Sequence, residues 1–218
     1  MNPPDRRTRK RLATRESISD AATRLFIARG FDHVTVDEIA AAADVGRMTV
    51  FNHFRRKEDM FFDREEEARD ILIDAVRGRA SDVAPLEALR RLAHRLVADG
   101  SPYLGFDEDT LRFAATIAAS DALKARARAI RDEVALALAE ALAASVEQPA
   151  DDADARLAAN LLMATWTVAF TQALAGLDRD GDRQAAQTTF LSLVDKGTRG
   201  MVAALAGTPY ALLKGRPT

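Results

Sequence analysis

The segment 47–53 concentrates side chains that can bind nucleic acid. These side chains are Arg47, Met48, Thr49, Phe51, Asn52 and His53. The guanidinium, hydroxyl, amide and imidazole groups are donors and acceptors suited to base edges and phosphates. The thioether side chain can touch a thymine methyl group. If one exposed helix face carries these groups, the segment can read a groove of duplex DNA.

A short helix is expected immediately before this segment. Thr35 is followed three residues later by Glu38, which is the spacing of a capping box. The helix should therefore begin at Val36. The apolar residues at positions 39, 40 and 43 then fall on one face, which predicts that this face packs inward.

A second helix is expected after a tight turn at positions 44–46. Gly46 can adopt the backbone angles that a turn requires, so the helix should start near Arg47. Val50 and Phe54 are four residues apart and should face the core, which leaves the other side chains of the segment outside. Two short helices joined by a turn form the layout of a DNA-reading helix-turn-helix.

The charge of the chain is distributed unevenly. The formal net charge is only −2, which by itself does not indicate a nucleic-acid partner. Two clusters are nevertheless basic: Arg6, Arg7, Arg9, Lys10, Arg11 and Arg15 near the start, and Arg55, Arg56 and Lys57 after the second short helix. A basic tail can be only a solvated arm, but beside a helix-turn-helix it favours phosphate contacts. Thr35 and Lys57, at expected helix N-termini, are predicted to hold phosphates.

The first quarter of the chain resembles the N-terminal domain of TetR-family (tetracycline-repressor-like) transcriptional regulators. The residues that carry the resemblance are Ile18, Ala21-Ala22, Leu25-Phe26, Gly30-Phe31, Thr35-Val36, Ile39-Ala40, Val45, Thr49-Val50-Phe51, His53-Phe54 and Lys57-Glu58. The chain departs from the family pattern at Asp44, Gly46, Met48 and Phe51, where the family usually has Gly, Ser, Gly and Tyr. The missing Ser removes a capping hydroxyl, and the missing Tyr removes a phosphate-contacting one.

Beyond the motif, the sequence predicts helices almost throughout, and the fold class is all-α. A first helix is expected at about 10–29, ending at Gly30, and another from Lys57 to about Arg77. Further helices are expected at about 85–99, 107–119, 121–145, 153–178 and 182–206, separated by Gly and Pro breakers. About nine helices are expected in all, and the expected division is a basic arm at 1–14, a three-helix DNA-binding domain at 15–60, a larger effector-binding and dimerisation domain at 61–210 and a tail at 211–218.

The span 157–177 contains no charged residue and is about as long as a membrane-crossing helix. Its polar residues, which include Asn160 and Gln172, fit better a helix that is buried on most sides within a protein. The following helix carries an apolar face with Gly197, Gly200 and Ala204, which allow a close helix neighbour. We expect the surplus apolar surface of 153–178 and 182–206 to be buried against a second copy of the chain. The family resemblance implies the same dimeric four-helix bundle.

Catalysis has little support in the sequence. The chain has no cysteine, and its three histidines, His33, His53 and His94, lack the spacing of a metal site. No Gly-rich phosphate loop or nucleophile elbow is present. An acidic run, Asp63 with residues 65–67, could suggest paired catalytic carboxylates, but a solvated face near a helix N-terminus is favoured. We therefore expect no catalytic residues, no metal and no cofactor.

The resemblance implies an effector cavity among the middle helices. The candidate lining is Leu89, Leu92, His94, Leu96, Phe113, Thr116, Ile117, Ile130, Val134, Met163, Trp166, Thr167, Phe170 and Thr171. These residues are mostly apolar, as pocket linings usually are, although each can equally pack the core. The only tryptophan of the chain, Trp166, is the leading candidate because its ring can border a cavity while its N–H seeks a partner. His94 is most often a satisfied interior residue in such a context.

Together these patterns predict a cytoplasmic homodimeric repressor that leaves a palindromic operator when a small, largely apolar effector binds. The alternative is an all-α small-molecule-binding or protein-interaction module that does not read DNA. No apolar signal-peptide segment begins the chain, so secretion is not expected.

Overall fold

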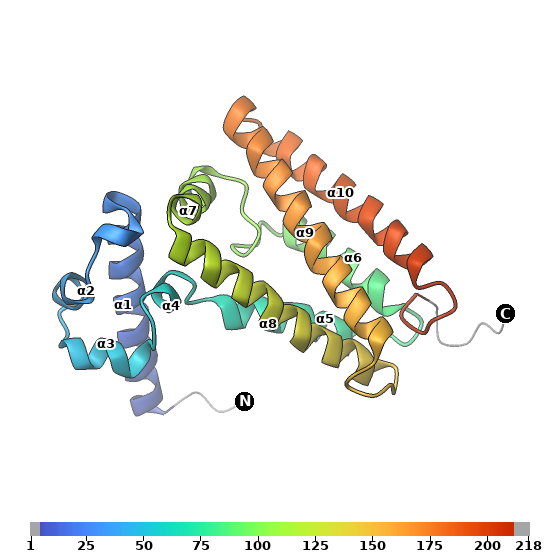
Figure 1. The fold of residues 1–218 in the computed structure, drawn as a ribbon, viewed down its shortest axis with the longest axis horizontal. Coiled ribbons are helices and arrows are strands. Elements are labelled where there is room, and N and C mark those ends of the chain that lie inside the picture. Colours follow the sequence, from blue (N-terminus) through green and yellow to red (C-terminus); the bar gives the residue numbers. More distant parts are fainter. Residues whose placement is uncertain (1–4, 212–218) are drawn as a thin grey trace. The chain divides into compact units, whose positions relative to one another are not determined.

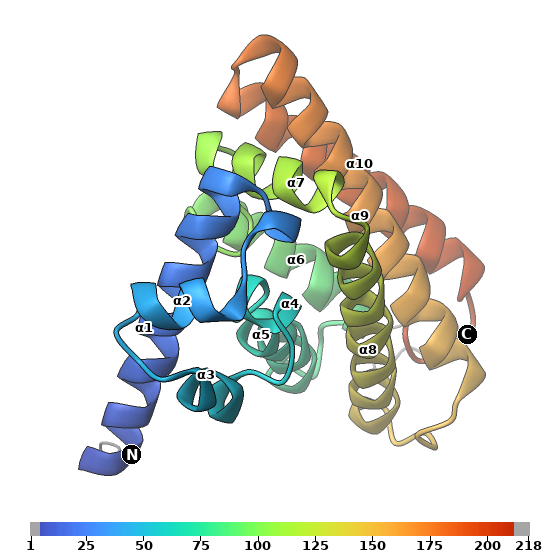
Figure 2. The same ribbon diagram turned by 60° about the vertical axis from the view of Figure 1, so that its left-hand side comes forward.

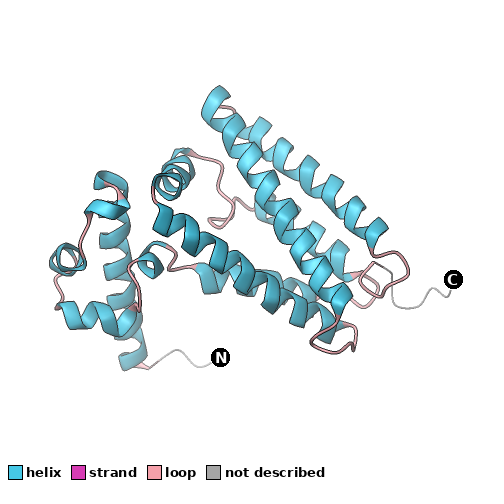
Figure 3. Cartoon of the chain, in the orientation of Figure 1, coloured by secondary structure: helices cyan, strands magenta, loops and turns pink. Residues whose placement is uncertain are grey.

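The computed structural model describes residues 5–211, and within this range it contains only helices and connecting loops (Figures 1 and 3). Ten α-helices and one short 3-10 helix are present, and no strand occurs among the described residues. The predicted all-α class is confirmed. Residues 1–4 of the expected basic arm and 212–218 of the expected tail lie outside the described residues.

The described residues divide into two compact units, each of which takes two stretches of chain. Unit 1 comprises the residues up to Glu65 together with Arg112–Arg128, and unit 2 comprises Glu66–Leu111 and the residues from Ala129 onward. This division differs from the expected continuous domains, because the residues 112–128 complete the apolar core of unit 1.

Unit 1 is built on α1 (Arg6–Arg29), against which the short elements pack. These are η1 (Phe31–His33), α2 (Val36–Ala42), α3 (Arg47–His53) and α4 (Glu58–Phe61), with the second half of α7 (Glu108–Ala119) and the first turns of α8 (Asp121–Ser145). Figure 2 shows α2 and α3 beside α1 with the connecting turn between them. The predicted starts at Val36 and Arg47 and the stop of the first helix at Gly30 are confirmed.

The first helix begins four residues earlier than predicted. Asp5 is its N-cap, and the Asp5 Oδ1 atom accepts a hydrogen bond from the Thr8 amide at 2.7 Å. An aspartate at this position satisfies one of the free amides of the first turn, so the helix can start at Arg6. The basic residues from Arg6 to Arg15 therefore lie on α1 rather than on a separate arm.

An aromatic cluster fills the core of unit 1. The Phe26 and Phe31 rings lie 4.8 Å apart, and the Phe61 ring stacks on that of Phe113 at a centroid distance of 4.3 Å. Phe113 and the fully buried Leu123 come from a stretch far along the chain. Offset and tilted aromatic pairs of this kind add to the free energy gained by burying their apolar surface.

The prediction of a single helix from Lys57 to Arg77 is wrong. The chain instead forms α4 and α5 (Glu65–Arg77), separated by a break at which Phe62 has non-helical angles of φ −104° and ψ 37°. The Arg126 guanidinium bridges the break, because it binds Asp59 on one side and Glu65 on the other. Glu65 is thus an ion-pair partner rather than part of the solvated acidic face that the sequence suggested.

Unit 2 packs α5, α6 (Pro85–Ala98), most of α8, α9 (Ala153–Asp180) and α10 (Arg183–Ala204) around one apolar core. The chain after α10 closes this core with Tyr210, which is 1% exposed and donates a hydrogen bond to the Asp152 carboxylate at 2.8 Å. Asp152 also caps α9, because its Oδ1 atom accepts from the Ala155 amide. The Tyr210 hydroxyl thereby ties the end of the described chain to the start of α9.

The last two helices, α9 and α10, lie side by side and antiparallel (Figure 1). A Cβ atom added at Gly197 would lie only 2.3 Å from Thr165 Cγ2, so this glycine provides the close approach that the sequence predicted. Within the described chain Gly200 has open space around it and Ala204 is exposed, so the close neighbour expected at these two positions stays a prediction for a second copy. Among the described helices α9 alone is long and apolar enough to cross a membrane, a test that core helices of soluble proteins also meet.

Candidate nucleic-acid interface

A capping box fixes the first helix of the helix-turn-helix. The Thr35 hydroxyl accepts from the Glu38 amide, and the Glu38 carboxylate accepts from the Thr35 amide at 2.8 Å. These bonds to Thr35 and an ion pair with Arg29 lower the pKa of Glu38 to about 2. The predicted capping box is confirmed, and it stabilises the N-terminus of α2.

The turn between α2 and α3 places its unusual backbone at Asp44 and not at Gly46. Asp44 has φ +53°, whereas Gly46 has φ −75° and serves as the N-cap of α3 without a side-chain bond. The interpretation of Gly46 as the residue with turn-specific angles is therefore wrong. An aspartate tolerates the left-handed region better than most side chains do, but at a cost that glycine avoids.

Replacing Asp44 by glycine is expected to raise the free energy of unfolding by about 0.5 to 1 kcal/mol, because the strained φ is relieved. Urea denaturation followed by circular dichroism measures the change. The matched control is Ala41→Gly on the exposed side of α2, which should lower the same quantity by a similar amount. An Asp44→Gly variant that is less stable than the parent would show that the carboxylate contributes more than the strain costs.

The recognition helix, α3, has one buried and one exposed face. Val50 is fully buried and Phe54 is 2% exposed, as predicted, whereas Met48 is 72% and Phe51 is 41% exposed. Arg47 and Asn52 are also exposed, while Thr49 and His53 are half-buried at the edge of this face. Large apolar side chains flanked by polar groups on an exposed face are typical of a surface that binds a partner.

Arg47 is held by an acidic neighbour from the first helix. Its guanidinium donates to the Asp37 carboxylate at 2.7 Å, and the two side chains are 58% and 63% exposed. An ion pair this exposed contributes little free energy and is easily opened. Asp37 thus orients Arg47 without preventing it from turning toward DNA, a role that the sequence analysis did not assign to Asp37.

Arg15 of α1 supports the far end of α3. Its guanidinium donates to the His53 carbonyl at 2.8 Å and lies 4.2 Å above the centre of the Phe54 ring. Partial burial and the charges of Arg11 and Arg15 lower the pKa of His53. The neutral imidazole, which can both donate and accept, is therefore favoured at neutral pH.

Two residues expected to hold phosphates are occupied within the protein. The Lys57 ammonium donates to the carbonyls of Phe31 and Val34, at 2.8 and 3.0 Å, and lies 4.0 Å from the centre of the Phe31 ring. The Thr35 hydroxyl is used by the capping box. A phosphate contact by Lys57 would therefore compete with these two carbonyls, and α4 offers only a four-residue helix there.

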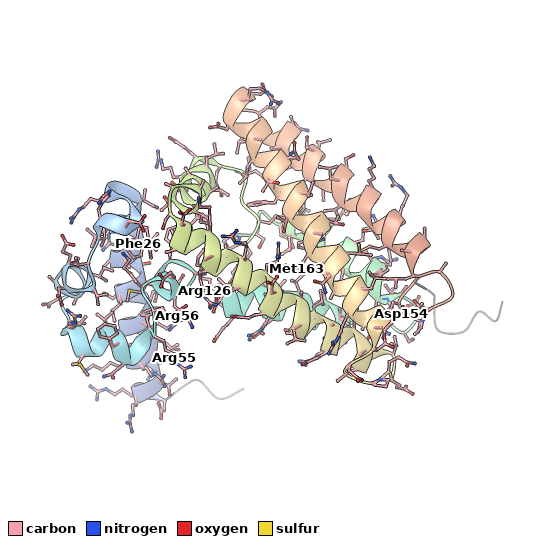
Figure 4. The ribbon with its side chains drawn as sticks, viewed as in Figure 1. Phe26, Arg55, Arg56, Arg126, Asp154 and Met163 are labelled. Atoms are coloured by element: carbon pink, nitrogen blue, oxygen red, sulfur yellow. The ribbon has the colours of Figure 1, made fainter. Side chains whose placement is uncertain are left out.

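The exposed basic side chains lie instead on α1 and after α3. Arg55 and Arg56 are exposed on the segment that follows α3, and Figure 4 labels both at this edge of unit 1. The arginines and lysine of residues 6–11 are exposed on the first turns of α1. These guanidinium groups belong to the same unit as the exposed face of α3. They provide the positive charge that binding to a phosphate backbone requires.

The residues expected to line an effector cavity do not form a single set. Phe113, Thr116 and Ile117 belong to unit 1, where Thr116 lines a cavity of about 530 Å³ with Phe31 and Ser120. The remaining candidates belong to unit 2, and they are Leu89, Leu92, His94, Leu96, Ile130, Val134, Met163, Trp166, Thr167, Phe170 and Thr171.

Several unit 2 candidates have other roles. Leu89 and Val134 are buried in the core. Thr167 and Thr171 are exposed, and each hydroxyl donates to a carbonyl of its own helix. His94 binds Asp195 at 2.9 Å beside Arg90, so it is a satisfied partner of α10.

Trp166 differs from the other candidates because its indole nitrogen has no partner. Its Nε1 atom is buried without an acceptor in the part of the chain that the structure describes. The ring packs edge-on against Phe190 with centroids 6.0 Å apart, and Phe190 also contacts Phe106. A buried N–H without an acceptor is rare in folded proteins and calls for an explanation.

A helix-turn-helix unit with a basic, exposed recognition face and a second, larger helical unit defines a DNA-binding regulator class. Comparison with known proteins is consistent with this class. Residues 18–63 match the family model described as bacterial regulatory proteins, tetR family. The transcriptional regulator TcmR of Streptomyces glaucescens is 34% identical over 88 residues, a stretch that covers 40% of this chain and 39% of TcmR. The match to the family thus covers the helix-turn-helix region, and the chain spans less than half the length of the curated relatives it matches.

Solved structures extend the likeness to most of the chain. FadR of Thermus thermophilus, a TetR-family transcriptional repressor solved with lauroyl-CoA, is 25% identical with a TM-score of 0.55 and covers 94% of this chain and 98% of its own. NalD of Pseudomonas aeruginosa, the secondary repressor of the MexAB-OprM multidrug efflux pump, has a TM-score of 0.56 at 22% identity over 88% of this chain and 96% of NalD. Both of these solved proteins are described as repressors.

Proposed function

We propose that this chain is a cytoplasmic, homodimeric transcriptional repressor that reads a palindromic operator through α3. The observation that carries the proposal is the two-faced recognition helix, in which Val50 and Phe54 anchor one side while Arg47, Met48 and Asn52 stand on the other. The match of residues 18–63 to the family model of bacterial regulatory proteins supports regulation as the output.

Within the proposed interface, Arg47, Thr49, Asn52 and His53 contact base edges. Arginine pairs with guanine and asparagine with adenine in the major groove, and the exposed Met48 side chain contacts a thymine methyl. Arg55 and Arg56, with the basic turns of α1, bind phosphates and set the salt dependence of binding.

The proposed dimer forms through α9 and α10. Leu157 and Val168 of α9 are 45% and 53% exposed, and Val202 of α10 is 40% exposed. Burial of these side chains against a second copy removes apolar surface from water. Two recognition helices related by a two-fold axis require half-sites separated by whole helical turns, so the operator should be palindromic.

The proposed effector binds in unit 2 beside Trp166. On α9, Trp166 follows Thr165, which packs against Gly197 of α10. Gly197 is in turn followed by Thr198, whose hydroxyl is also buried without a partner among the described residues. The two unsatisfied groups thus flank one helix contact. A largely apolar molecule with a hydrogen-bond acceptor satisfies them, and the lauroyl-CoA complex of FadR shows that this fold accommodates an acyl ligand. Release from DNA requires that the effector binds the DNA-incompetent state more tightly.

Fluorescence anisotropy with duplexes selected from the upstream region of the protein's own gene tests the proposal. The parent should bind a symmetric duplex more tightly than either half-site alone. Arg47→Ala should weaken binding by about 1 to 2 kcal/mol and relax preference at one or two base pairs, because a bidentate contact is lost. Arg69→Ala, an exposed arginine of unit 2, is the matched control and should bind as the parent does.

The alternative function is an all-α small-molecule-binding or protein-interaction module that does not read DNA. If this alternative holds, the parent should show no preference among duplex sequences, and its affinity for DNA should be lost at physiological salt. Equal affinity of the parent and Arg47→Ala for every duplex would likewise assign α3 a role other than base reading.

A further inference from the structure

A second cavity lies in unit 2 where the segment after α5 meets α6. Its volume is about 270 Å³, and it is bordered by Asp74 and Ala75 of α5, by Arg79 and Val83 of the connecting segment, and by α6. This volume lies just below the range of about 300 to 1,000 Å³ that drug-sized ligands occupy, so the cavity suits a smaller molecule. None of the residues assigned to DNA or to the effector borders it.

Three arginines line this cavity. Arg91 and Arg95 are four residues apart, so they share one face of α6, and Arg79 comes from the connecting segment. The only acidic residue in the lining is Asp74. The lining itself carries three positive charges and one negative charge, and Glu87, which lies outside the lining, pairs with Arg91 at 2.7 Å. Like charges gathered around a cavity favour a bound anion that offsets their repulsion.

The guanidinium groups have unused donors. Arg79 donates from Nη2 to the Ser145 carbonyl at 3.0 Å, but its buried Nε atom has no acceptor in the described chain. Arg91 uses only Nε, which donates to Glu87 at 2.7 Å, and the Arg95 side chain makes no hydrogen bond or ion pair with any described residue. Buried donors are normally satisfied, so the unpaired Arg79 Nε is an observation independent of the cavity itself.

We infer that this cavity binds a small phosphate monoester. Such a group carries close to two negative charges at neutral pH, which complements the excess of arginines in the lining, and its three oxygens can each accept from a guanidinium. Arginine is the side chain best suited to this planar, bidentate recognition. A single carboxylate has only two oxygens to accept from three arginines, and the apolar wall of Ala75 and Val83 leaves room for a short carbon chain.

Isothermal titration calorimetry of the full-length protein tests the inference with inorganic phosphate and glycerol 3-phosphate as separate titrants. Both should bind, and the monoester should bind more tightly if the organic part occupies the apolar wall. Acetate and sodium chloride at the same ionic strength are the controls for simple charge screening. Tighter binding of inorganic phosphate than of the monoester would assign the site to free phosphate.

The decisive variants are Arg95→Gln and Arg91→Gln, because both side chains are exposed on α6 and their replacement should leave the fold intact. Each should weaken phosphate binding about ten-fold, the effect of one lost charge-assisted contact. Arg199→Gln, an exposed arginine of α10 outside the cavity, should leave affinity unchanged. Arg79→Gln removes the bond to Ser145 and therefore requires a thermal-unfolding control.

Three outcomes would overturn the inference. They are binding that chloride reproduces at equal ionic strength, affinity that is unaffected by both α6 variants, and no measurable binding to the folded parent. If the arginines were only structural, the variants would unfold at lower temperature without any phosphate-dependent difference from the parent. DNA binding is measured separately, so failure here leaves the assignment of α3 intact.

Discussion

Replacing Arg126 by leucine is expected to lower the free energy of unfolding by about 3 kcal/mol. The Arg126 side chain is only 10% exposed, and it donates to Asp59 at 3.1 Å and to both carboxylate oxygens of Glu65 at 2.7 and 2.8 Å (Figure 4 labels Arg126 on α8). Its removal leaves two partly buried carboxylates without their shared cation, which costs more than the pair itself contributes. Urea denaturation followed by circular dichroism measures the loss.

A triple variant provides the control for this prediction. When Asp59→Asn and Glu65→Gln accompany Arg126→Leu, no unpaired charge remains, and a substantial part of the stability should return. Arg131→Leu, which removes an exposed arginine of the same helix, should change stability by less than about 0.5 kcal/mol. An Arg126→Leu variant as stable as Arg131→Leu would show that the ion pairs are energetically neutral.

Replacing Lys57 by methionine is expected to destabilise the protein by about 2 kcal/mol and to leave the salt dependence of DNA binding nearly unchanged. The ammonium satisfies the carbonyls of Phe31 and Val34, and a methionine of similar length leaves both without a donor. Since the charge faces the protein, its loss should release few counterions from DNA. Chemical unfolding gives the stability, and the slope of log affinity against log salt gives the number of phosphate contacts.

Arg56→Met is the matched variant, because Arg56 is exposed on the same segment. It should behave in the opposite way, with little change in stability and a salt slope reduced by about one. If Lys57→Met instead kept full stability and flattened the salt slope, Lys57 would be a phosphate ligand after all.

Local signals in the sequence were sufficient to locate the helix-turn-helix. The capping box of Thr35 and Glu38 and the four-residue spacing of Val50 and Phe54 each involve neighbours in the chain, and the structure has both as predicted. The bounds of the later helices were also close, because Gly and Pro residues mark their ends. Periodicity and breakers therefore predict this all-α architecture well.

The errors have specific physical causes. Arg126 is 61 residues beyond Glu65, so no local pattern could reveal the ion pair that bridges the break between α4 and α5. Apolar character does not show to which core a residue belongs, so the sequence places Phe113 of the unit 1 core and Leu89 of the unit 2 core in one expected cavity. Two other errors were avoidable, because an aspartate before a basic run is an N-cap signal at Asp5, and Asp44 stands where the family has glycine.

Because unit 1 is built from two separate stretches of chain, its DNA specificity is difficult to transfer to another regulator by a gene fusion. A gene fusion that joins the residues up to Glu65 to another regulator would carry the recognition helix but leave behind Phe113, Leu123 and Arg126. The stack on Phe61 and the cation between Asp59 and Glu65 would then have to be supplied by the recipient. Transfer of specificity by recombination at a single crossover is therefore restricted to recipients that already hold equivalent side chains in their own middle helices. Substitution of individual residues on α3 is free of that restriction.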